Sequence, residues 1–427
     1  MESLDGQIIY QIFPRNYSEE GTFKKIAEDL DRIKDLGVDI IYLMPINEIG
    51  KINRKGTYGS PYASIDYYSI SPDLGTEKDL KELINETHKR GMKIIVDMVF
   101  DHTSPDSVLT YDHIEFYYIE NGLPVNRISE WDDVIDLDVE RQDTQEYLIE
   151  VLRYWQSVGF DGFRFDVASI IPLKFFTRAR LALGNDAIFF AESVDDGFKR
   201  YLRRIKHYYE EDENLPPTFD LLYNYNYYCD LRKYFDTGDK EYARKAFRTI
   251  NKESVLNREI LRSNCLENHD NDRIAALTSS NQLDNFLTMF ILLRGAGFIY
   301  AGQEYGLKHK PNLFEKDPIL WANKDEEVFD FVKELIKLKK EFGPIEAQNI
   351  EEIGDLFVFK VLLRNATSER LLILNLNKEP VNFKKIIAET DDDELVQIIY
   401  DKVKEEKITE LTHPMIVTLI EKGSSKA

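Results

Sequence analysis

The 427-residue sequence has little cysteine, little glycine and proline, and no long apolar run, and each shortage excludes a class of protein. Its two cysteines, Cys229 and Cys265, cannot build a disulfide framework and belong to no Cys-x-x-Cys motif, so we expect a reducing, cytoplasmic location and no structural zinc. The 21 glycines and 14 prolines are too few for a collagen-like or low-complexity chain. Residues 1–6 lack a basic and apolar leader, and no later stretch reaches the roughly 18 apolar residues that span a bilayer.

Positive charge is also scarce. The chain has 55 Lys and Arg against 77 Asp and Glu, which gives a formal net charge of −22 at pH 7. Such a field repels nucleic-acid phosphates and anionic membranes, so we expect a neutral or cationic partner, with no nucleic acid and no membrane. The oligomeric state stays open.

The first three quarters of the chain alternate short apolar runs with amphipathic helical patterns, which is typical of βα units around a parallel sheet. Thr76 and Asp79, for example, have the spacing of a capping box at the start of a helix. Eight expected strands predict an α/β fold of the (β/α)₈ TIM-barrel class. They cover residues 8–13, 40–44, 93–96, 162–165, 188–191, 218–222, 264–266 and 297–301.

Two segments do not fit the barrel pattern. Residues 104–135, rich in Tyr, Asp and Glu, are too long for a simple βα loop and are predicted to form a short inserted lobe after the third strand. After a helix that stops at Gly343, the pattern changes to strands alone, which predicts a C-terminal antiparallel β-sandwich domain. We therefore divide the chain into a barrel (1–103 and 136–345), a lobe (104–135) and a C-terminal domain (346–427), the last with strands expected at 356–363, 371–375, 396–400 and 416–420.

Acidic residues follow four of the expected barrel strands, where a barrel of this kind builds its active site. Asp97 follows one strand, Asp166 and Glu192 directly follow two others, and Asp270 comes shortly after a fourth. Arg164 stands two residues before Asp166, so the two side chains share one face of a strand.

The surroundings of the two central carboxyl groups are expected to differ. The Arg164 guanidinium should hold Asp166 ionised, as a nucleophile or an electrostatic stabiliser requires. Glu192 follows an apolar run and has no adjacent cation in the sequence, which predicts the raised pKa of a general acid. Two carboxyl groups in contrasting surroundings are what glycoside hydrolysis uses.

Each of these residues also has an ordinary structural explanation. An Asp at a strand end is more often a helix cap, an Arg beside an Asp is usually a structural ion pair, and Tyr62 could be a half-buried aromatic side chain. For Asp97 alone we favour the structural role. The coincidence of four strand ends, in order, favours a functional site.

At these positions the sequence resembles the α-amylase family of glycoside hydrolases, glycoside hydrolase family 13. The resemblance spans about residues 6–306 and is carried by four motifs in the family's order, with two further matches near the ends of the barrel. The motifs are Asp-Met-Val-Phe-Asp-His (97–102), Asp-Gly-Phe-Arg-Phe-Asp (161–166), Phe-Ala-Glu (190–192) and Glu-Asn-His-Asp (267–270), and the further matches are Tyr-Gln-Ile-Phe-Pro (10–14) and Tyr-Ala-Gly-Gln-Glu (300–304).

The resemblance implies a role for each matched residue. Asp166 would be the nucleophile, Glu192 the acid and then the base, and Asp270 the carboxylate that binds sugar hydroxyls and favours the transition state. Retention of anomeric configuration would follow if the carboxyl groups of Asp166 and Glu192 lie about 5–5.5 Å apart. The residues implied to bind the same sugar are Tyr62, which would stack on it, His102, Arg164, His269 and Asp97.

The sequence also departs from the family pattern. Asp101 replaces an Asn that commonly binds a structural calcium, so calcium binding is left open, although the chemistry requires no cofactor. Val167 and Ala168 stand where many α-amylases have a Lys-His pair that grips the leaving-group side. The lobe is short, which predicts an open cleft.

The resemblance therefore implies a cytoplasmic, retaining hydrolase of α-1,4-glucosidic bonds in maltodextrins or malto-oligosaccharides. A sugar can intercept the covalent intermediate as well as water can, so a transglycosylase, an isomerase or an α-1,6-glucosidase of the same family is the alternative. A catalytically silent carbohydrate-binding homologue would predict the loss of a carboxylate, yet all three are present. An unrelated barrel enzyme with a catalytic divalent metal would lose its activity in EDTA.

Overall fold

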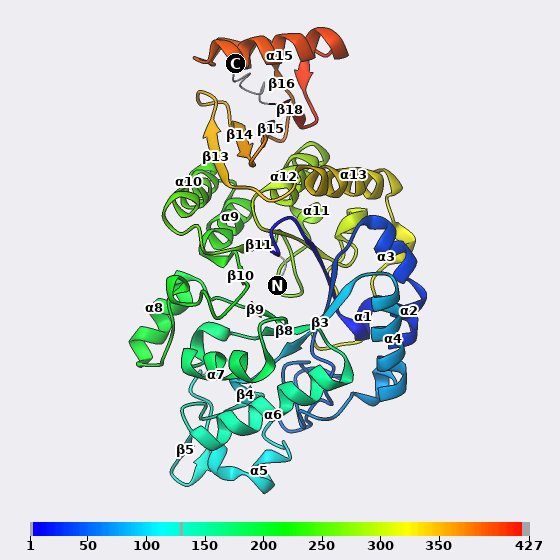
Figure 1. Cartoon of the computed structure of the whole chain (residues 1–427), viewed down its shortest axis with the longest axis vertical. Coiled ribbons are helices and arrows are strands. Elements are labelled where there is room, and N and C mark those ends of the chain that lie inside the picture. Colours follow the sequence, from blue (N-terminus) through cyan, green and yellow to red (C-terminus); the bar gives the residue numbers. More distant parts are fainter. Residues whose placement is uncertain (1–2, 129–130, 421–427) are drawn as a thin grey trace, which may run out of the picture.

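Eight parallel strands close into a barrel in the computed structural model, which describes residues 3–128 and 131–420 (Figure 1). Neighbours in the barrel follow the chain order, and β1 pairs with β12 to close the ring. The strands are buried on both faces, which explains their nearly continuous apolar runs. They are β1 Ile8–Ile12, β2 Ile40–Leu43, β3 Lys93–Met98, β8 Gly162–Phe165, β9 Ile188–Ala191, β10 Leu221–Tyr223, β11 Arg262–Asn264 and β12 Ala296–Tyr300.

The predicted (β/α)₈ barrel is confirmed, and two of its strands are displaced from the expected ranges. The strand expected over 218–222 is β10 Leu221–Tyr223. We expected a strand over 264–266, whereas β11 is Arg262–Asn264. The start of β11 could not be found from an apolar run, because the strand begins with the charged residue Arg262. Arg262 is nevertheless buried, because its Nη1 lies 2.7 Å from Asp212 Oδ2 and its guanidinium also pairs with Glu253.

Helices surround the barrel and connect its strands. The capping box predicted at Thr76 is present: the Asp79 N–H donates to Thr76 Oγ1 and the Thr76 N–H donates to the Asp79 carboxylate. No helix of the described residues has the length and apolar character needed to cross a membrane. The helices of this part are α1 Pro14–Tyr17, α2 Phe23–Glu28, α3 Leu30–Leu36, α4 Glu77–Lys89, α6 Gln142–Val158, α7 Leu173–Leu183, α8 Asp196–Ile205, α9 Tyr225–Thr237, α10 Lys240–Leu256, α11 Ile274–Leu277, α12 Ser280–Leu292 and α13 Glu326–Phe342.

A small lobe interrupts the barrel between β3 and α6 (Figure 1). The chain leaves through β4 His102–Thr103 and returns through β7 Ile135–Asp136, and these two strands pair antiparallel, so the lobe begins and ends at one place on the rim. Between them lie α5 Leu109–Asp112 and a hairpin of β5 Ile119–Glu120 and β6 Leu123–Pro124. Residues 129–130 of the predicted lobe lie outside the described residues.

The C-terminal domain contains a four-stranded antiparallel sheet in the order β13-β14-β15-β18 and lies at the opposite end of the molecule from the lobe (Figure 1). Its strands are β13 Ala347–Glu352, β14 Val358–Arg364, β15 Ser368–Asn375 and β18 Met415–Ile420, with a minor pair of β16 Val381–Asn382 and β17 Glu410–Leu411. The predicted antiparallel sheet is therefore confirmed. Residues 1–2 and 421–427 of the predicted divisions lie outside the described residues.

The prediction of a strand over 396–400 is wrong, because these residues belong to helix α15 Asp393–Glu406. Leu395 and Ile399 lie four residues apart on one helix face, and both are buried in the core that also contains residues of the sheet. The Asp392 side chain caps the helix by accepting the Leu395 N–H. Together with α14 Phe383–Ala388, this helix supplies the layer that a β-sandwich would give to a second sheet.

Candidate active site

The acidic residues predicted at the strand ends converge on one mouth of the barrel. Asp97 lies near the end of β3, Asp166 directly follows β8, and Glu192 directly follows β9. These three strands are neighbours, and their register places Arg164 of β8 beside Asp97 of β3. Because parallel strands end at the same rim, three carboxyl groups meet around one guanidinium.

Arg164 is completely buried beneath this cluster and contacts all three carboxyl groups. Its Nη1 lies 2.8 Å from Asp97 Oδ1 and 2.7 Å from Asp166 Oδ1, and its Nη2 lies 2.9 Å from Glu192 Oε2. We expected Glu192 to have no cation beside it, and this expectation is wrong. The cation comes from the neighbouring strand, so its proximity depends on how β8 and β9 pair.

The protonation of Asp166 also differs from expectation. Burial raises the pKa of Asp166 well above its usual value; Arg164 opposes this shift, whereas Glu192 and Asp97 add to it. A single guanidinium shared by three carboxyl groups therefore does not hold Asp166 ionised down to the usual pH of an aspartate. A nucleophilic role requires the carboxylate, so this group makes the chemistry sensitive to pH.

Val167, the residue after Asp166, has a strained backbone. Its φ of 37° and ψ of 41° lie in the left-handed region, which β-branched residues rarely occupy. In this conformation its N–H donates a 2.8 Å hydrogen bond to Glu192 Oε2. The strained peptide therefore orients the carboxyl group of Glu192, a function that no side-chain pattern in the sequence could reveal.

Tyr62 and His269 lie side by side in the same mouth. Their rings stack with centroids 5.4 Å apart, and Tyr62 Oη lies 2.7 Å from His269 Nε2 and 3.0 Å from Asp97 Oδ2. Burial, with a contribution from Arg164, lowers the pKa of His269 to about 3, so its ring is neutral at ordinary pH. The Gln11 side-chain amide lies 2.9 Å from Nδ1 and donates to it, which places the ring proton on Nε2.

Two residues of this network were not predicted as site residues, although Gln11 lies within the matched stretch 10–14. Gln11 lies within the buried strand β1, and Tyr42 of β2 donates a 2.6 Å hydrogen bond to Asp97 Oδ2. A polar residue inside an apolar strand was the available signal for Gln11, because a buried amide needs a partner. Tyr42 gave no such signal, since aromatic residues are common in strands.

His102 also lies at the mouth, next to the start of the lobe. Burial opposes the change, but the hydrogen bond that His102 Nδ1–H donates to Asp101 Oδ2, at 3.3 Å, raises the pKa of His102. Asp136 of β7 pairs with Arg127, whose Nε lies 3.0 Å from Asp136 Oδ2.

These contacts bear on the calcium site that the sequence left open. The carboxylates of Asp101 and Asp136 already face an imidazole and a guanidinium. The described part of the chain contains no group of three or more Asp, Glu, His or Cys side chains placed to hold a metal ion. The residues around Asp101 therefore do not fit a calcium site.

A cavity of about 300 Å³ lies over the cluster, at the small end of the range for ligand sites. Six of the predicted residues line it, whereas Arg164 and Asp97 lie buried below. The Asp270 side chain is 47% exposed and so is accessible to a ligand. The six are Tyr62, His102, Asp166, Glu192, His269 and Asp270; the lining residues that we did not predict include Lys55, Trp131, Asp133 and Phe314.

A second cavity of about 620 Å³ adjoins the first, because Asp270 lines both. Its walls come from the loop after Glu192 and from helices α8 and α9, with Asp195, Arg200 and Tyr225 among the lining residues. It has both charged and aromatic side chains, as a site for a polyhydroxyl ligand would.

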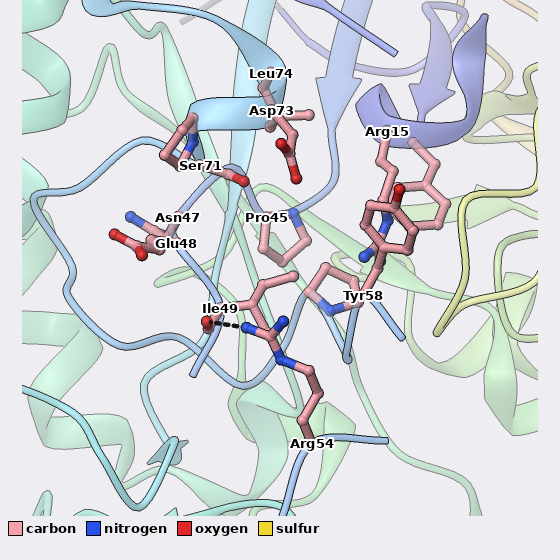
Figure 2. A pocket seen from close by; sticks show the side chains of 13 residues that line it. Arg15, Pro45, Asn47, Glu48, Ile49, Arg54, Tyr58, Ser71, Asp73 and Leu74 are labelled. Atoms are coloured by element: carbon pink, nitrogen blue, oxygen red, sulfur yellow. Dashed lines mark hydrogen bonds between the residues drawn. The ribbon is translucent and has the colours of Figure 1, made fainter. Parts of the chain in front are cut away.

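A third cavity, of about 210 Å³, is lined by residues of the loop after β2, among them Ile49, Arg54 and Tyr58 (Figure 2). Arg15 stands beside the ring of Tyr58 in this view, and the Arg54 guanidinium donates a 2.8 Å hydrogen bond to the carbonyl of Ile49. None of the predicted site residues lines this cavity. It is therefore separate from the carboxyl cluster.

Barrel architecture and site together define a class: a glycoside-hydrolase barrel, with its acidic groups supplied by successive strand ends. The family model described as "Alpha amylase, catalytic domain" matches residues 7–117 and 129–342. The chain therefore belongs to the α-amylase family, as the motifs had indicated.

Solved structures and curated relatives agree with this assignment. An α-amylase from Lactobacillus plantarum is 31% identical, with a TM-score of 0.84 over 97% of this chain and 98% of that chain. The maltogenic α-amylase AmyB from Thermotoga neapolitana is 28% identical, with a TM-score of 0.77 over 88% and 87% of the two chains. Neopullulanase 2 from Thermoactinomyces vulgaris is 25% identical over 400 residues, which cover 80% of this chain and 64% of that protein, so the chain spans less than two thirds of this relative.

Proposed function

We propose that this protein is a retaining glycoside hydrolase that cleaves α-1,4-glucosidic bonds in maltodextrins or malto-oligosaccharides. The observation that carries the proposal is the placement of Asp166 and Glu192 on one guanidinium, below a cavity that Asp270 also lines. The names of similar proteins support the substrate class, and an intracellular maltogenic amylase of Bacillus subtilis, 25% identical over 389 residues, supports action in the cytoplasm.

Each carboxyl group has one task in the proposed reaction. The Asp166 carboxylate attacks the anomeric carbon while protonated Glu192 gives its proton to the glycosidic oxygen, so the C–O bond to the leaving sugar breaks as the glycosyl ester forms. Glu192 then removes a proton from water, which attacks the same carbon and releases Asp166. Two inversions give a product that retains the α configuration.

Other residues position these groups. Arg164, held by Asp97, fixes the places of both carboxyl groups, and the Val167 N–H fixes one oxygen of Glu192. Neutral His269, Tyr62 and Asp270 line the cavity above, where they can contact the hydroxyls and the ring of a sugar.

The test is a timed analysis of the products from maltoheptaose, by mass and by anomeric proton NMR. We expect shorter products released first as the α-anomer by the wild-type protein and none by Asp166→Asn. Asp186→Asn, which removes an exposed carboxylate outside the site, serves as the matched control and should match the wild type. Wild-type activity in Asp166→Asn, or a β-anomer released first, would contradict the proposal.

A transglycosylase is the second candidate, and the cavity of about 620 Å³ beside Asp270 favours it, because an acceptor sugar would have room there. Products longer than maltoheptaose in the same experiment would identify that activity. A parallel reaction in EDTA separates both candidates from a metal-dependent enzyme, since neither of them uses a metal in the chemical step.

A further inference from the structure

Contacts between the loop after β2 and the lobe form part of the wall of the catalytic cavity. Lys55 Nζ lies 2.9 Å from Asp133 Oδ1 and 3.1 Å from Asp132 Oδ1, and the Asn53 side-chain amide donates a 3.1 Å hydrogen bond to the Asp132 carbonyl. Lys55 and Asp133 both line the cavity, and the Asp133 side chain is only 7% exposed. We call the group Asn53, Lys55, Asp132, Asp133 and Phe314 the end wall.

Phe314 completes the end wall from the loop after β12. The Tyr58 N–H donates to the Phe314 carbonyl at 3.0 Å, and the Thr57 N–H donates to Glu315 Oε1 at 2.9 Å. Gly56 has a φ of 62°, and a Cβ there would approach Phe314 Cβ to 2.8 Å. The loop that carries Lys55 is thus held on both sides of the cavity, by the lobe and by the β12 loop.

Arg15 anchors the end wall from behind. It lies between the same two loops, and its Nη2 donates to the Gly59 carbonyl at 3.1 Å and to the Leu313 carbonyl at 2.9 Å. Arg54 braces the loop from within, because its guanidinium donates to the Gly50 carbonyl and, as Figure 2 shows, to the Ile49 carbonyl. A wall with this many contacts is formed before any ligand arrives.

The catalytic cavity adjoins the second cavity, which is lined by residues of the loop after Glu192. Asp270 lines both, and the second cavity is also lined by Asp195 and Asp196, which follow Glu192 by three and four residues. A general acid must face the oxygen of the leaving group. The leaving part of the substrate therefore extends from Glu192 into the larger cavity, and the sugar attacked by Asp166 lies on the side of the end wall.

We propose that the end wall makes the enzyme exo-acting: the non-reducing end of the oligosaccharide stops at Lys55 and Asp133, and a short product is released from that end. This inference rests on the proposed function, because it presumes attack by Asp166 at the anomeric carbon of the enclosed sugar. It adds that the ion pair between the β2 loop and the lobe determines where along a glucan the cut falls.

The test compares maltoheptaose with the same oligosaccharide carrying a cyclic acetal on the two terminal hydroxyls of its non-reducing end. We expect the wild-type kcat/KM for the capped substrate to be lower by at least about tenfold, because the cap meets the wall. Lys55→Ala should bring the ratio of the two kcat/KM values close to one. Because Lys55→Ala leaves the buried Asp133 without its cation, the double variant Lys55→Ala/Asp133→Asn is measured beside it.

Lys51→Ala is the matched control, since Lys51 is an exposed residue of the same loop and does not line the cavity. It should keep the wild-type ratio. The inference would be overturned if the wild type had the same kcat/KM for both substrates. It would also be overturned if Lys55→Ala and the double variant kept the wild-type ratio of the two kcat/KM values. Failure of the wild type to cleave either substrate would instead overturn the proposed function, and the inference with it.

Discussion

At the mouth of the barrel one guanidinium faces three carboxyl groups, so the charge of Asp166 depends on its neighbours as much as on its own burial. Asp97 takes part in this balance in two ways. Its carboxylate raises the pKa of Asp166 directly, and it also competes for Arg164 Nη1. Both effects favour the protonated form of Asp166.

We therefore predict that Asp97→Asn moves the acid limb of the pH profile of kcat/KM to lower pH. Asp166 must lose its proton to attack, so activity is lost as the pH falls through its pKa, and that pKa falls when a neighbouring carboxylate is removed. The absolute rate should also fall, because Asp97 holds Arg164 in place. The measurement is kcat/KM against pH, with Asp186→Asn as the control whose acid limb stays in place. If the acid limb of Asp97→Asn stayed at the wild-type pH or moved to higher pH, this explanation of the carboxyl cluster would be wrong.

The residue scale also shows where prediction from sequence ends. The acids at the strand ends could be found because a strand end is visible as the end of an apolar run, and Arg164 and Asp166 share a strand. The contact of Arg164 with Glu192, the Gln11 amide on His269 and the Tyr42 hydroxyl on Asp97 all join different strands. Such contacts depend on how the barrel closes and on the register of neighbouring strands, and neither can be predicted from the sequence of a single strand.

Among the elements, helix α4 has a local sequence signal that was sufficient to predict where the helix begins. Its capping box satisfies two backbone groups with two side chains that lie three residues apart. We predict that Thr76→Ala lowers the free energy of unfolding by about 1 kcal/mol, the usual cost of a lost N-cap. Denaturant titration measures the change, and Thr412→Ala at an exposed position should leave the midpoint in place. A loss of less than a few tenths of a kcal/mol would show that the box contributes little here.

Helix α15 and strand β11 show why local signals failed elsewhere. The window 396–400 contains Val, Ile, Ile and Tyr, which favour strands, but the buried positions Leu395 and Ile399 follow the period of a helix. Strand β11 is short and begins with Arg262, which pairs with Asp212, 50 residues earlier in the sequence. In both elements the tertiary partner, rather than local propensity, determined the structure.

Helix α13 carries a buried lysine that makes stability depend on pH. Burial lowers the pKa of Lys339 to about 8, and its Nζ donates to the Leu293 carbonyl at 2.7 Å. Between about pH 8 and the ordinary lysine pKa the unfolded chain binds more protons than the folded one, so stability rises with pH in this window. We predict that the free energy of unfolding of the wild type, relative to Lys339→Met, rises by roughly 3 kcal/mol across it.

Denaturant titrations of both proteins at several pH values measure this difference. The comparison with Lys339→Met cancels the titration of all groups that the two proteins share. A difference that stayed constant, or fell, as the pH rose from 8 to 10 would contradict the assignment of a neutral, buried amine to Lys339.

Over the whole molecule, the C-terminal domain is joined to the barrel by polar and aromatic contacts on α10 and α12. Arg244 of α10 pairs with Glu352 at 2.6 Å, and the Gln282 side chain of α12 donates to the Leu376 carbonyl at 2.9 Å. Phe247 of α10 meets Phe359 of β14 edge to face, with ring centroids 4.8 Å apart, and both rings are buried. Both rings belong to one apolar core cluster that the barrel and the C-terminal sheet share, so we expect the two parts to unfold together.

A double-mutant cycle tests this coupling. Phe247→Ala and Phe359→Ala should each lower the free energy of unfolding by about 3–5 kcal/mol, and the double variant should lose less than the sum, by about 0.5–1.5 kcal/mol. The pair Phe247→Ala and Phe23→Ala is the control: Phe23 lies in α2, on the other side of the barrel, so these two losses should add (Figure 1). If Phe359→Ala instead splits the single unfolding transition into two while Phe247→Ala does not, the C-terminal domain folds as an independent unit. In that case the ring contact contributes to the stability of the sheet alone and does not join the domain to the barrel that carries the site.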